Sequence, residues 1–227
     1  MFKLITALIA LITAMNSYAV TPAKDAPSKE EQHALYIEFL KNDFLTYSWT
    51  DDYGVFGAFD SQQDLSKRYY AFYDIDGNGI DEMLVGESGV EKDRKASACY
   101  IFFIENNEVK PVKYFMGYFD WFDRYGPVFY SDGKVYDYAY GPEVIPAESC
   151  GFYRLEDGKM KCWCRFDAES DFKLREAFKT CKVTIYGDEE ETKYEIPSFI
   201  AKIIIDYLKL GKTVEPDWQP VAQFAQP

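Results

Sequence analysis

The sequence predicts an α+β fold: an antiparallel β meander of about eight or nine strands with an N-terminal and a C-terminal helix packed on it. Short runs of alternating aromatic and aliphatic residues recur along the chain, separated by Gly, Asn or Asp, which is the pattern of β-hairpins. Strong helix signals lie before the first and after the last of these strand-like runs. The runs do not recur at a fixed period, so we do not predict a propeller.

Four hairpins are predicted from these runs, and we expect their strands to form one strongly curved sheet. In chain order they pair Tyr69–Tyr73 with Met83–Val85, Ala98–Ile104 with Val109–Phe115, Pro127–Tyr130 with Val135–Tyr140, and Gly151–Leu155 with Met160–Phe166. A short helix over Asp171–Thr180, a strand over Lys182–Tyr186 and an acidic turn over Gly187–Glu191 follow. The stretch Ser48–Ser66 is expected to be a loop or a lid.

The N-terminal helix is predicted from Ser28 and Glu31, which match a capping box, and extends to about Tyr47. Its buried stripe is expected to consist of Tyr36, Ile37, Leu40 and Phe44. His33 lies near the start of this helix, and we interpret it as a surface residue rather than a catalyst.

The C-terminal helix is predicted over Ser198–Leu210, with Pro197 at its first position and Gly211 just past its end. We expect a broad apolar face that packs on the sheet, formed by Phe199, Ile200, Ile203, Ile204, Tyr207 and Leu208. The tail that follows carries Trp218 and Phe224, which we expect to cover the core.

The loop of the first hairpin has the composition of a calcium site. Aspartate, aspartate and asparagine alternate with glycines, and Ca²⁺ prefers six to eight oxygen ligands from carboxylates and carbonyls. A tight turn brings alternate side chains toward one point, and the glycines let the backbone pass close to an ion. The predicted ligands are Asp74, Asp76, Asn78, the backbone carbonyl of Ile80, and Glu82.

This loop, residues 74–82, is EF-hand-like rather than an EF-hand. The twelfth position of the pattern is Val85, which offers no carboxylate, and the flanking segments are strand-like. The loop is closer to the short calcium loops between strands in integrin-type repeats. Asp81 is then expected to point outward or to cap the turn. The alternative is a plain glycine-rich turn whose Asp and Asn side chains bond their own backbone.

The N-terminus predicts export. Lys3, the apolar run Leu4–Met15 and a small residue at Ala19 match a cleavable signal peptide over residues 1–19. Residues 20–29 then form a linker, and residues 30–227 a single domain in the periplasm or the medium. The net charge of −13 argues against nucleic acid or an anionic membrane as partner.

Five cysteines in an exported chain predict disulfides. Cys162 and Cys164 are expected on the same face of a strand and are poorly placed to bond each other. A small register shift would allow a bond between Cys150 and Cys164. Cys99 with Cys181 is a second candidate pair.

Several segments together resemble a family of small exported bacterial proteins of unassigned function. They are YYAFYDIDGNGIDEMLVG, YIFFIENNEVKPVKYF, VFYSDGKVY, GFYRLEDGKM, the GDEEE turn and DWQPVAQF, which extend from Tyr69 to Phe224. The resemblance implies an α+β domain with the acidic loop on a hairpin, and it implies no activity. The helix start at Ile196-Pro197-Ser198 departs from the family's pattern.

These observations favour a secreted, calcium-stabilised binding or interaction module over an enzyme. Its ligand would be a glycan or a protein, bound by aromatic residues around Trp121 in the run Tyr114–Tyr130. One alternative is a glycosidase-like hydrolase that uses Asp120 and Asp123.

A further alternative is an inhibitor of an envelope or host hydrolase, acting through the loop Glu143–Pro146. The chain has one histidine and no G-x-S-x-G or H-E-x-x-H motif, so no catalytic residue is assigned.

Overall fold

The computed structural model describes residues 27–43, 50–51, 54–55, 65–88, 95–112, 127–139, 149–169, 180–186 and 191–224. Its helices are α2 (Lys29–Asn42) and α3 (Ser198–Leu208), with short 3₁₀ turns η1 (Leu65–Lys67) and η2 (Val221–Phe224). None of the helices in these ranges is long and apolar enough to cross a membrane.

Two antiparallel sheets make up most of the described chain. The five-stranded sheet has the order β14-β3-β4-β5-β6 and the seven-stranded sheet the order β12-β11-β10-β9-β8-β7-β13. The strands of the five-stranded sheet are β3 (Arg68–Tyr73), β4 (Glu82–Glu87), β5 (Ser97–Glu105), β6 (Glu108–Pro111) and β14 (Gln219–Pro220). Those of the seven-stranded sheet are β7 (Val128–Tyr130), β8 (Val135–Ala139), β9 (Ser149–Glu156), β10 (Lys159–Glu169), β11 (Thr180–Tyr186), β12 (Glu191–Pro197) and β13 (Thr213–Val214). A separate pair joins β1 (Thr50–Asp51) to β2 (Gly54–Val55).

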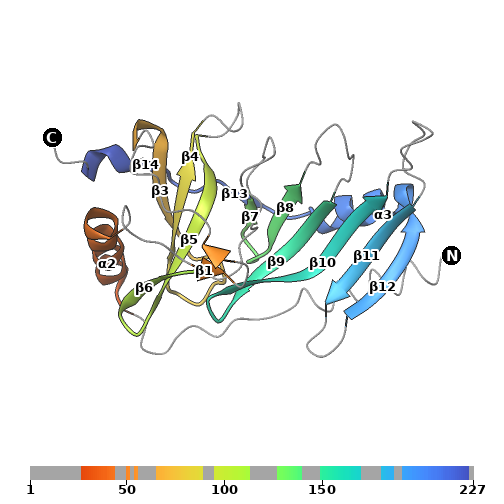
Figure 1. The fold of residues 1–227 in the computed structure, drawn as a ribbon, viewed down its shortest axis with the longest axis horizontal. Helices are drawn as coiled ribbons and strands as arrows, with labels where there is room; N and C mark the ends of the chain where they lie inside the picture. The colour runs from red at the N-terminus through yellow and green to blue at the C-terminus, as the bar shows by residue number, and fades with distance from the viewer. Residues whose placement is uncertain are drawn as a thin grey trace.

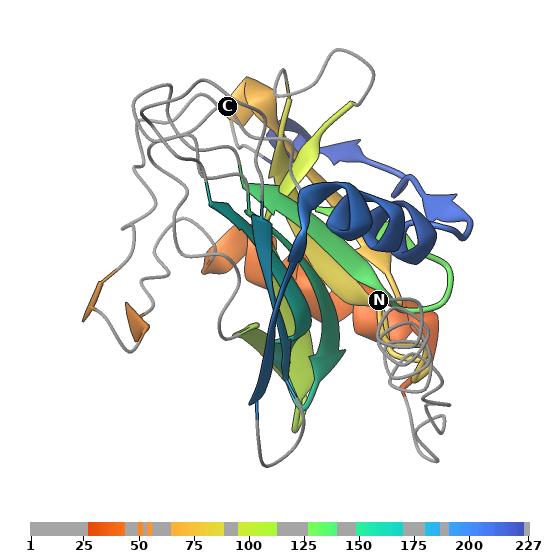
Figure 2. The same ribbon diagram turned by 90° about the vertical axis from the view of Figure 1, so that its right-hand side faces the viewer.

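The α+β class and the antiparallel meander are confirmed, but the expectation of one curved sheet of eight or nine strands is wrong. The elements stack in four layers: α2, the five-stranded sheet, the seven-stranded sheet and α3 (Figure 1). Seen from the α3 end, α3 lies in front of the seven-stranded sheet and α2 lies behind (Figure 2). One buried cluster fills each of the three spaces between the layers.

The physical reason for two sheets is visible in β4, which is buried on both faces. Met83 and Val85 pack with α2, whereas Leu84 between them packs against the seven-stranded sheet. All three side chains are fully buried. Successive side chains of a strand point to opposite faces, so a continuous apolar run indicates a strand with a partner layer on each side.

The C-terminal tail joins the two sheets. After α3, β13 pairs with β7 of the seven-stranded sheet and β14 pairs with β3 of the five-stranded sheet. Trp218 lies between them, is 2% exposed and packs into the cluster between the sheets. The tail therefore covers the core, as expected.

The predicted hairpins form where turn residues tolerate positive φ. Asn106 and Asn107 have φ of 53° and 65° between β5 and β6, and Asp157 and Gly158 have φ of 51° and 67° between β9 and β10. Positive φ at both central residues is the requirement of the two-residue turn that matches the twist of paired strands.

The strand β12 was not predicted from the sequence. Its residues, Glu191–Pro197, are mostly exposed and include glutamates and a lysine. It lies at the edge of the sheet, where only one neighbour pairs with it and charged side chains are favoured. Pro197 ends β12 and precedes α3 as its N-cap, so the prediction that Pro197 is the first helical residue is wrong by one position. The predicted helix Asp171–Thr180 lies outside the described residues, except that Thr180 begins β11.

The apolar face predicted for the C-terminal helix is only half buried. Ile200, Ile204 and Leu208 pack on the seven-stranded sheet. Phe199, Ile203 and Tyr207, which the prediction also placed on the sheet, are exposed. At the other end, α2 begins at Lys29 with Ser28 as its N-cap, and residues 20–26 of the expected linker lie outside the described residues. Of the predicted α2 stripe, Tyr36 and Leu40 are buried, and Phe44 lies outside the described residues.

The prediction that Cys162 and Cys164 share a face is wrong, because the register of β10 shifts between them. This β-bulge leaves Cys162 packed toward the cluster between the sheets and Cys164 in the cluster beneath α3. Among the residues with described side chains, Cys150, Cys162, Cys164 and Cys181 are free thiols. Burial raises the pKa of the Cys150 thiol to about 12. The disulfides Cys150–Cys164 and Cys99–Cys181 remain predictions.

Candidate metal centre

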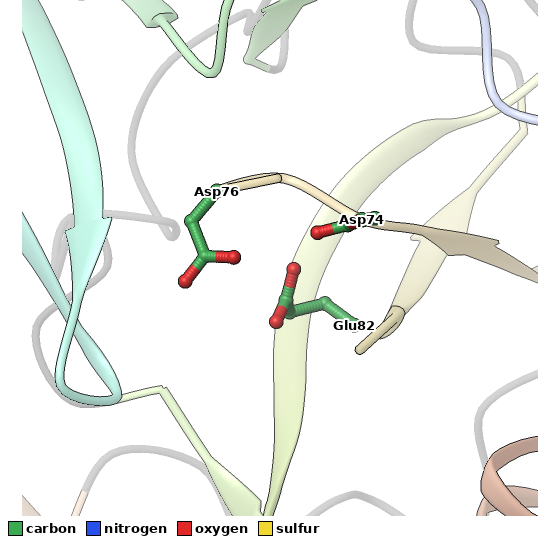
Figure 3. Close-up of side chains that lie close together, drawn as sticks. All are labelled: Asp74, Asp76 and Glu82. Carbon is green, nitrogen blue, oxygen red and sulfur yellow. The ribbon is translucent and has the colours of Figure 1, made fainter. Parts of the chain in front are cut away.

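The acidic loop connects β3 to β4 at the end of the five-stranded sheet. The last pair of the hairpin is Tyr73 with Glu82, so Asp74 and Glu82 stand on opposite limbs of the loop. One carboxylate oxygen each of Asp74, Asp76 and Glu82 lie within 4.8 Å of one another. The three carboxyl groups point toward a common space (Figure 3). The structure therefore brings three of the five predicted ligands together.

Backbone amides of the loop hold these carboxylates in place. The amide of Gly79 donates to Asp74 Oδ2 at 3.0 Å and the amide of Ile75 donates to Glu82 Oε2 at 2.8 Å. The amide of Asn78 donates to Asp76 Oδ1 at 3.0 Å. Each bond satisfies one oxygen and orients the carboxyl group, and for Asp76 the second oxygen also accepts, from Asn78 Nδ2.

One of these second oxygens has no partner in the described part of the chain. Asp74 Oδ1 is buried and accepts no hydrogen bond there. A buried carboxylate oxygen without a hydrogen bond or a cation is unfavourable by a few kcal/mol. The loop thus contains a buried acceptor that the described protein groups do not satisfy.

The surroundings of Glu82 and Asp76 favour protonation of these two carboxylates when no cation is present. Burial raises the pKa of Glu82 well above its usual value, and the charges of Asp76 and Asp74 raise it further. The Glu82 residue is 2% exposed. Burial also raises the pKa of Asp76, a shift that the amide of Asn78 opposes and the charge of Asp74 increases. The cluster has either to hold protons or to bind a cation.

The other two predicted ligands are placed differently. Asn78 donates from Nδ2 to Asp76 Oδ2 at 3.0 Å, and its Oδ1 accepts from the amide of Ile80 at 2.6 Å. Its amide group therefore braces the turn and its carbonyl oxygen faces the backbone. Ligation by Asn78 and by the Ile80 carbonyl remains a prediction.

Two glycines allow the loop to curl this tightly. Gly77 and Gly79 have φ of 75° and 92°, a region that residues with a Cβ rarely adopt. Nothing lies within 4 Å of the place where a Cβ of either residue would stand. The backbone conformation, and not crowding, accounts for glycine at these positions.

Side chains of the N-terminal helix α2 hydrogen-bond the end of the loop that leads into β4. Gln32 is fully buried, accepts from the amide of Asp81 at 2.8 Å and donates to the carbonyl of Gly79 at 3.2 Å. The hydroxyl of Tyr36 donates to the carbonyl of Asp81 at 2.8 Å. These contacts join residues that are 45 to 49 positions apart.

Asp81 does not point outward, contrary to expectation. Its carboxylate pairs with Lys29, and its Oδ2 lies 2.8 Å from His33 Nε2. The ring of His33 stacks on Phe72 at a centroid distance of 3.9 Å. His33 thus helps to dock α2 on the loop, and its side chain is 37% exposed.

The seven-stranded sheet approaches the loop from the other side. Gly133, in the turn between β7 and β8, has φ of 79°, and a Cβ there would lie 3.1 Å from the carbonyl oxygen of Ile75. The hydroxyl of Tyr73 donates to the carbonyl of Tyr130 at 3.1 Å. The loop therefore lies where three layers of the molecule meet.

The α2 residues that contact the loop were not predicted to support the metal site, although their spacing in the sequence was a signal. Lys29, Gln32, His33 and Tyr36 recur at helical spacing and share one side of α2. That side carries polar groups and contacts the loop, so an apolar stripe could not reveal it. The other residues singled out for function, Asp120, Trp121, Asp123 and Glu143–Pro146, lie outside the described residues.

Comparison with known proteins identifies no relative: no family model, no curated protein and no solved structure matches this chain.

Proposed function

We propose that this chain is an exported binding or interaction module in which the β3–β4 loop holds a structural Ca²⁺. The observation that carries the proposal is the buried oxygen Asp74 Oδ1, which lies in a cluster of three carboxylates and has no partner among the described residues. Asp74, Asp76 and Glu82 would hold the ion, and the Ile80 carbonyl and Asn78 are the further ligands that we expect.

The donor set supports calcium over softer metals. The three side chains offer oxygen alone, which suits hard cations, whereas zinc and copper sites favour histidine and cysteine. Ca²⁺ also accepts irregular geometry, while Mg²⁺ requires a near-ideal octahedron and keeps several waters. An irregular donor set on a loop therefore favours Ca²⁺ over Mg²⁺.

A structural role is supported by how enclosed the site is. Glu82 is 2% exposed, and the loop is held by α2 on one side and by the β7–β8 turn on the other. A substrate has little access to such carboxylates. An ion there would neutralise the charge and fix the junction of three layers, and the ligand of the module would bind elsewhere on its surface.

A calcium titration of the thermal midpoint tests the metal site. We expect the midpoint of the wild-type chain to rise, with an affinity of about 10⁻⁴–10⁻³ M as in other extracellular modules. A tenfold excess over Kd corresponds to about 1.4 kcal/mol, or roughly 2–4 °C for a domain of this size. Asp76→Ala should abolish the rise.

Asp217→Ala is the matched control, because Asp217 is an exposed aspartate far along the chain from the loop. It should respond to calcium as the wild type does. A wild-type midpoint that is the same in excess calcium and in EDTA would contradict the metal site. An equal rise with magnesium would contradict the choice of ion.

The binding role needs its own measurement. A glycan array and a pulldown from envelope and host extracts should give specific hits that survive in Asp76→Ala when the variant is folded. Turnover on a panel of glycosides that is lost in Asp120→Asn or Asp123→Asn would contradict the non-enzymatic assignment.

A further inference from the structure

The outward side of α3 presents an apolar surface that its own fold does not use. Phe199, Ile203, Tyr207 and Leu210, which we call the outer stripe, are 62%, 55%, 43% and 65% exposed. Phe199, Ile203 and Tyr207 recur every four residues on one face of α3, and Leu210 lies two residues past the end of the helix. The opposite face, with Ile204 and Leu208, is buried on the seven-stranded sheet, so the outer stripe contributes little to packing α3.

Exposed apolar residues are ordinary when they are scattered, but three large ones on one helix face with a fourth just past its end indicate a contact surface. The outer stripe includes two aromatic side chains, the type enriched at protein interfaces. Ser198 and the exposed Lys202 show that polar residues are tolerated elsewhere on the same helix. The helix therefore has no structural requirement for apolar residues on this face.

The charges that flank the outer stripe are self-complementary. Lys202 and Asp206 are both exposed and lie one turn apart on the same edge of the outer stripe. Lys209 is turned away from this pair, with its ammonium 4.0 Å from the ring centroid of Tyr136. The edge thus carries one positive and one negative group, placed on either side of the helix midpoint near Ile204.

We propose that the outer stripe binds a second copy of this chain, with the two α3 helices antiparallel about a two-fold axis near Ile204. In that arrangement Lys202 of each copy faces Asp206 of the other, which gives two ion pairs on one edge. Phe199 of each copy then faces Leu210 of the other. A parallel two-fold arrangement would instead put the charged edges of the two copies on opposite sides of the seam, so these two ion pairs would not form.

The charge of the whole chain supports this face over others. With 25 basic and 38 acidic residues, two copies repel each other over most of their surface. Within α3 the single lysine and single aspartate cancel, so the helix itself adds no net repulsion. The same net charge opposes binding of α3 to an anionic lipid surface.

The area that the proposed interface would bury sets the expected affinity of the dimer. At roughly 200 Å² for each large side chain, two half-exposed stripes would bury on the order of 800–1,000 Å² in total. Interfaces below about 1,200 Å² belong to weak or transient complexes. We therefore expect a dimer that forms in the micromolar to submillimolar range.

Sedimentation equilibrium of the chain, expressed with its own leader and with its N-terminus read by mass spectrometry, tests the proposal. From a few micromolar to several hundred micromolar, the mean mass should rise from monomer toward dimer. Ile203→Lys should keep the chain monomeric, and its thermal midpoint should stay near that of the wild type because Ile203 is exposed.

A charge exchange tests the antiparallel arrangement. Lys202→Asp should weaken the dimer at least tenfold, and adding Asp206→Lys should restore it, since the exchanged charges again face each other. Lys159→Asp makes the same charge change at the exposed β9–β10 turn and should leave the dimer unchanged.

Three results would overturn the proposal: a monomer at every concentration, a dimer that persists in Ile203→Lys, or a double variant as weak as Lys202→Asp alone. A monomer that binds zwitterionic lipid vesicles through the outer stripe would also overturn it and would assign a lipid surface instead. The outer stripe and the metal loop share no residue. Asp76→Ala should therefore lose calcium binding and keep the dimer, whereas Ile203→Lys should keep calcium binding and lose the dimer. A failure of this proposal can thus be told apart from a failure of the metal site.

Discussion

At the scale of single residues, the loop shows how burial changes the behaviour of ordinary carboxylates. Asp74, Asp76 and Glu82 would be acidic groups with normal titration in water. In the folded chain one oxygen of each lies within 4.8 Å of the others, and burial together with the neighbouring charges raises the pKa of Asp76 and of Glu82. A cation or a proton can relieve that repulsion, and pH decides between them.

The first prediction concerns pH. The raised pKa of Glu82 means that the calcium-free folded chain holds more protons than the unfolded chain above the ordinary value of 4.5. The free energy of unfolding in EDTA should therefore fall as pH rises from about 4.5 toward neutrality. Calcium needs the ionised carboxylates, so the difference in thermal midpoint between calcium and EDTA should grow over the same range.

Glu82→Gln is the matched variant for this prediction. The side-chain oxygen of glutamine can still accept from the amide of Ile75, but glutamine carries no charge. In EDTA at neutral pH the variant should be more stable than the wild type, and calcium should not change its midpoint. A calcium effect of equal size at pH 5 and pH 7.5 would contradict the coupling.

At the scale of elements, α2 and the loop depend on each other. Helix α2 begins with a capping box, in which Ser28 accepts from the amide of Glu31 and Glu31 accepts from the amide of Ser28. That local start places Lys29, Gln32 and His33 in the turns that face the loop. The helix therefore satisfies backbone groups of the loop that would otherwise be buried without partners.

The second prediction is that Gln32→Met destabilises the chain by about 1–3 kcal/mol, since half-buried backbone groups at Gly79, Asp81 and Pro27 lose their partner. Methionine has a similar length and is apolar, so the lost hydrogen bonds dominate the effect. Calcium affinity should fall as well, because the end of the loop that leads into β4 is no longer held. Urea unfolding and a calcium titration measure the two effects.

Glu38→Met controls for the change in side-chain type, because Glu38 is exposed on the same helix. Its effect should stay within about 0.5 kcal/mol. Equal effects of the two variants would show that the hydrogen bonds of Gln32 to the loop contribute nothing specific to stability.

At the scale of the whole molecule, stability depends on the three clusters between the four layers. The middle cluster is formed by both sheets and by Trp218 from the tail. Because β13 and β14 pair with different sheets, the tail ties the two halves together. The indole Nε1 of Trp218 is buried and has no partner among the described residues.

The third prediction separates the volume of Trp218 from its polar atom. Trp218→Ala should cost about 3–5 kcal/mol through the cavity that it leaves between the sheets. Trp218→Phe should cost less than half as much, because it keeps an aromatic ring and removes the unsatisfied N–H. Chemical denaturation of both variants in the same buffer provides the comparison, and equal losses would contradict this account.

Much of this architecture could be predicted from local sequence. The hairpins follow from Asn106-Asn107 and Asp157-Gly158, whose backbone preference is a property of a few neighbouring residues. The capping box at Ser28 is local in the same way. The three carboxylates lie within nine consecutive residues, so their approach depended mainly on one turn.

Other features required the tertiary structure, because they join residues that are distant in the chain. Only packing decided that the strands divide into two sheets, that Gln32 and Asp81 meet, and that a bulge separates Cys162 from Cys164. Helical periodicity indicates which residues of α3 are apolar, but not which of them a neighbouring layer covers. The sequence by itself therefore determined the hairpins and the acidic loop, which depend on short-range backbone geometry. The tertiary structure alone decided the four layers, the enclosure of the loop and the exposed stripe, since burial is a property of all the layers together.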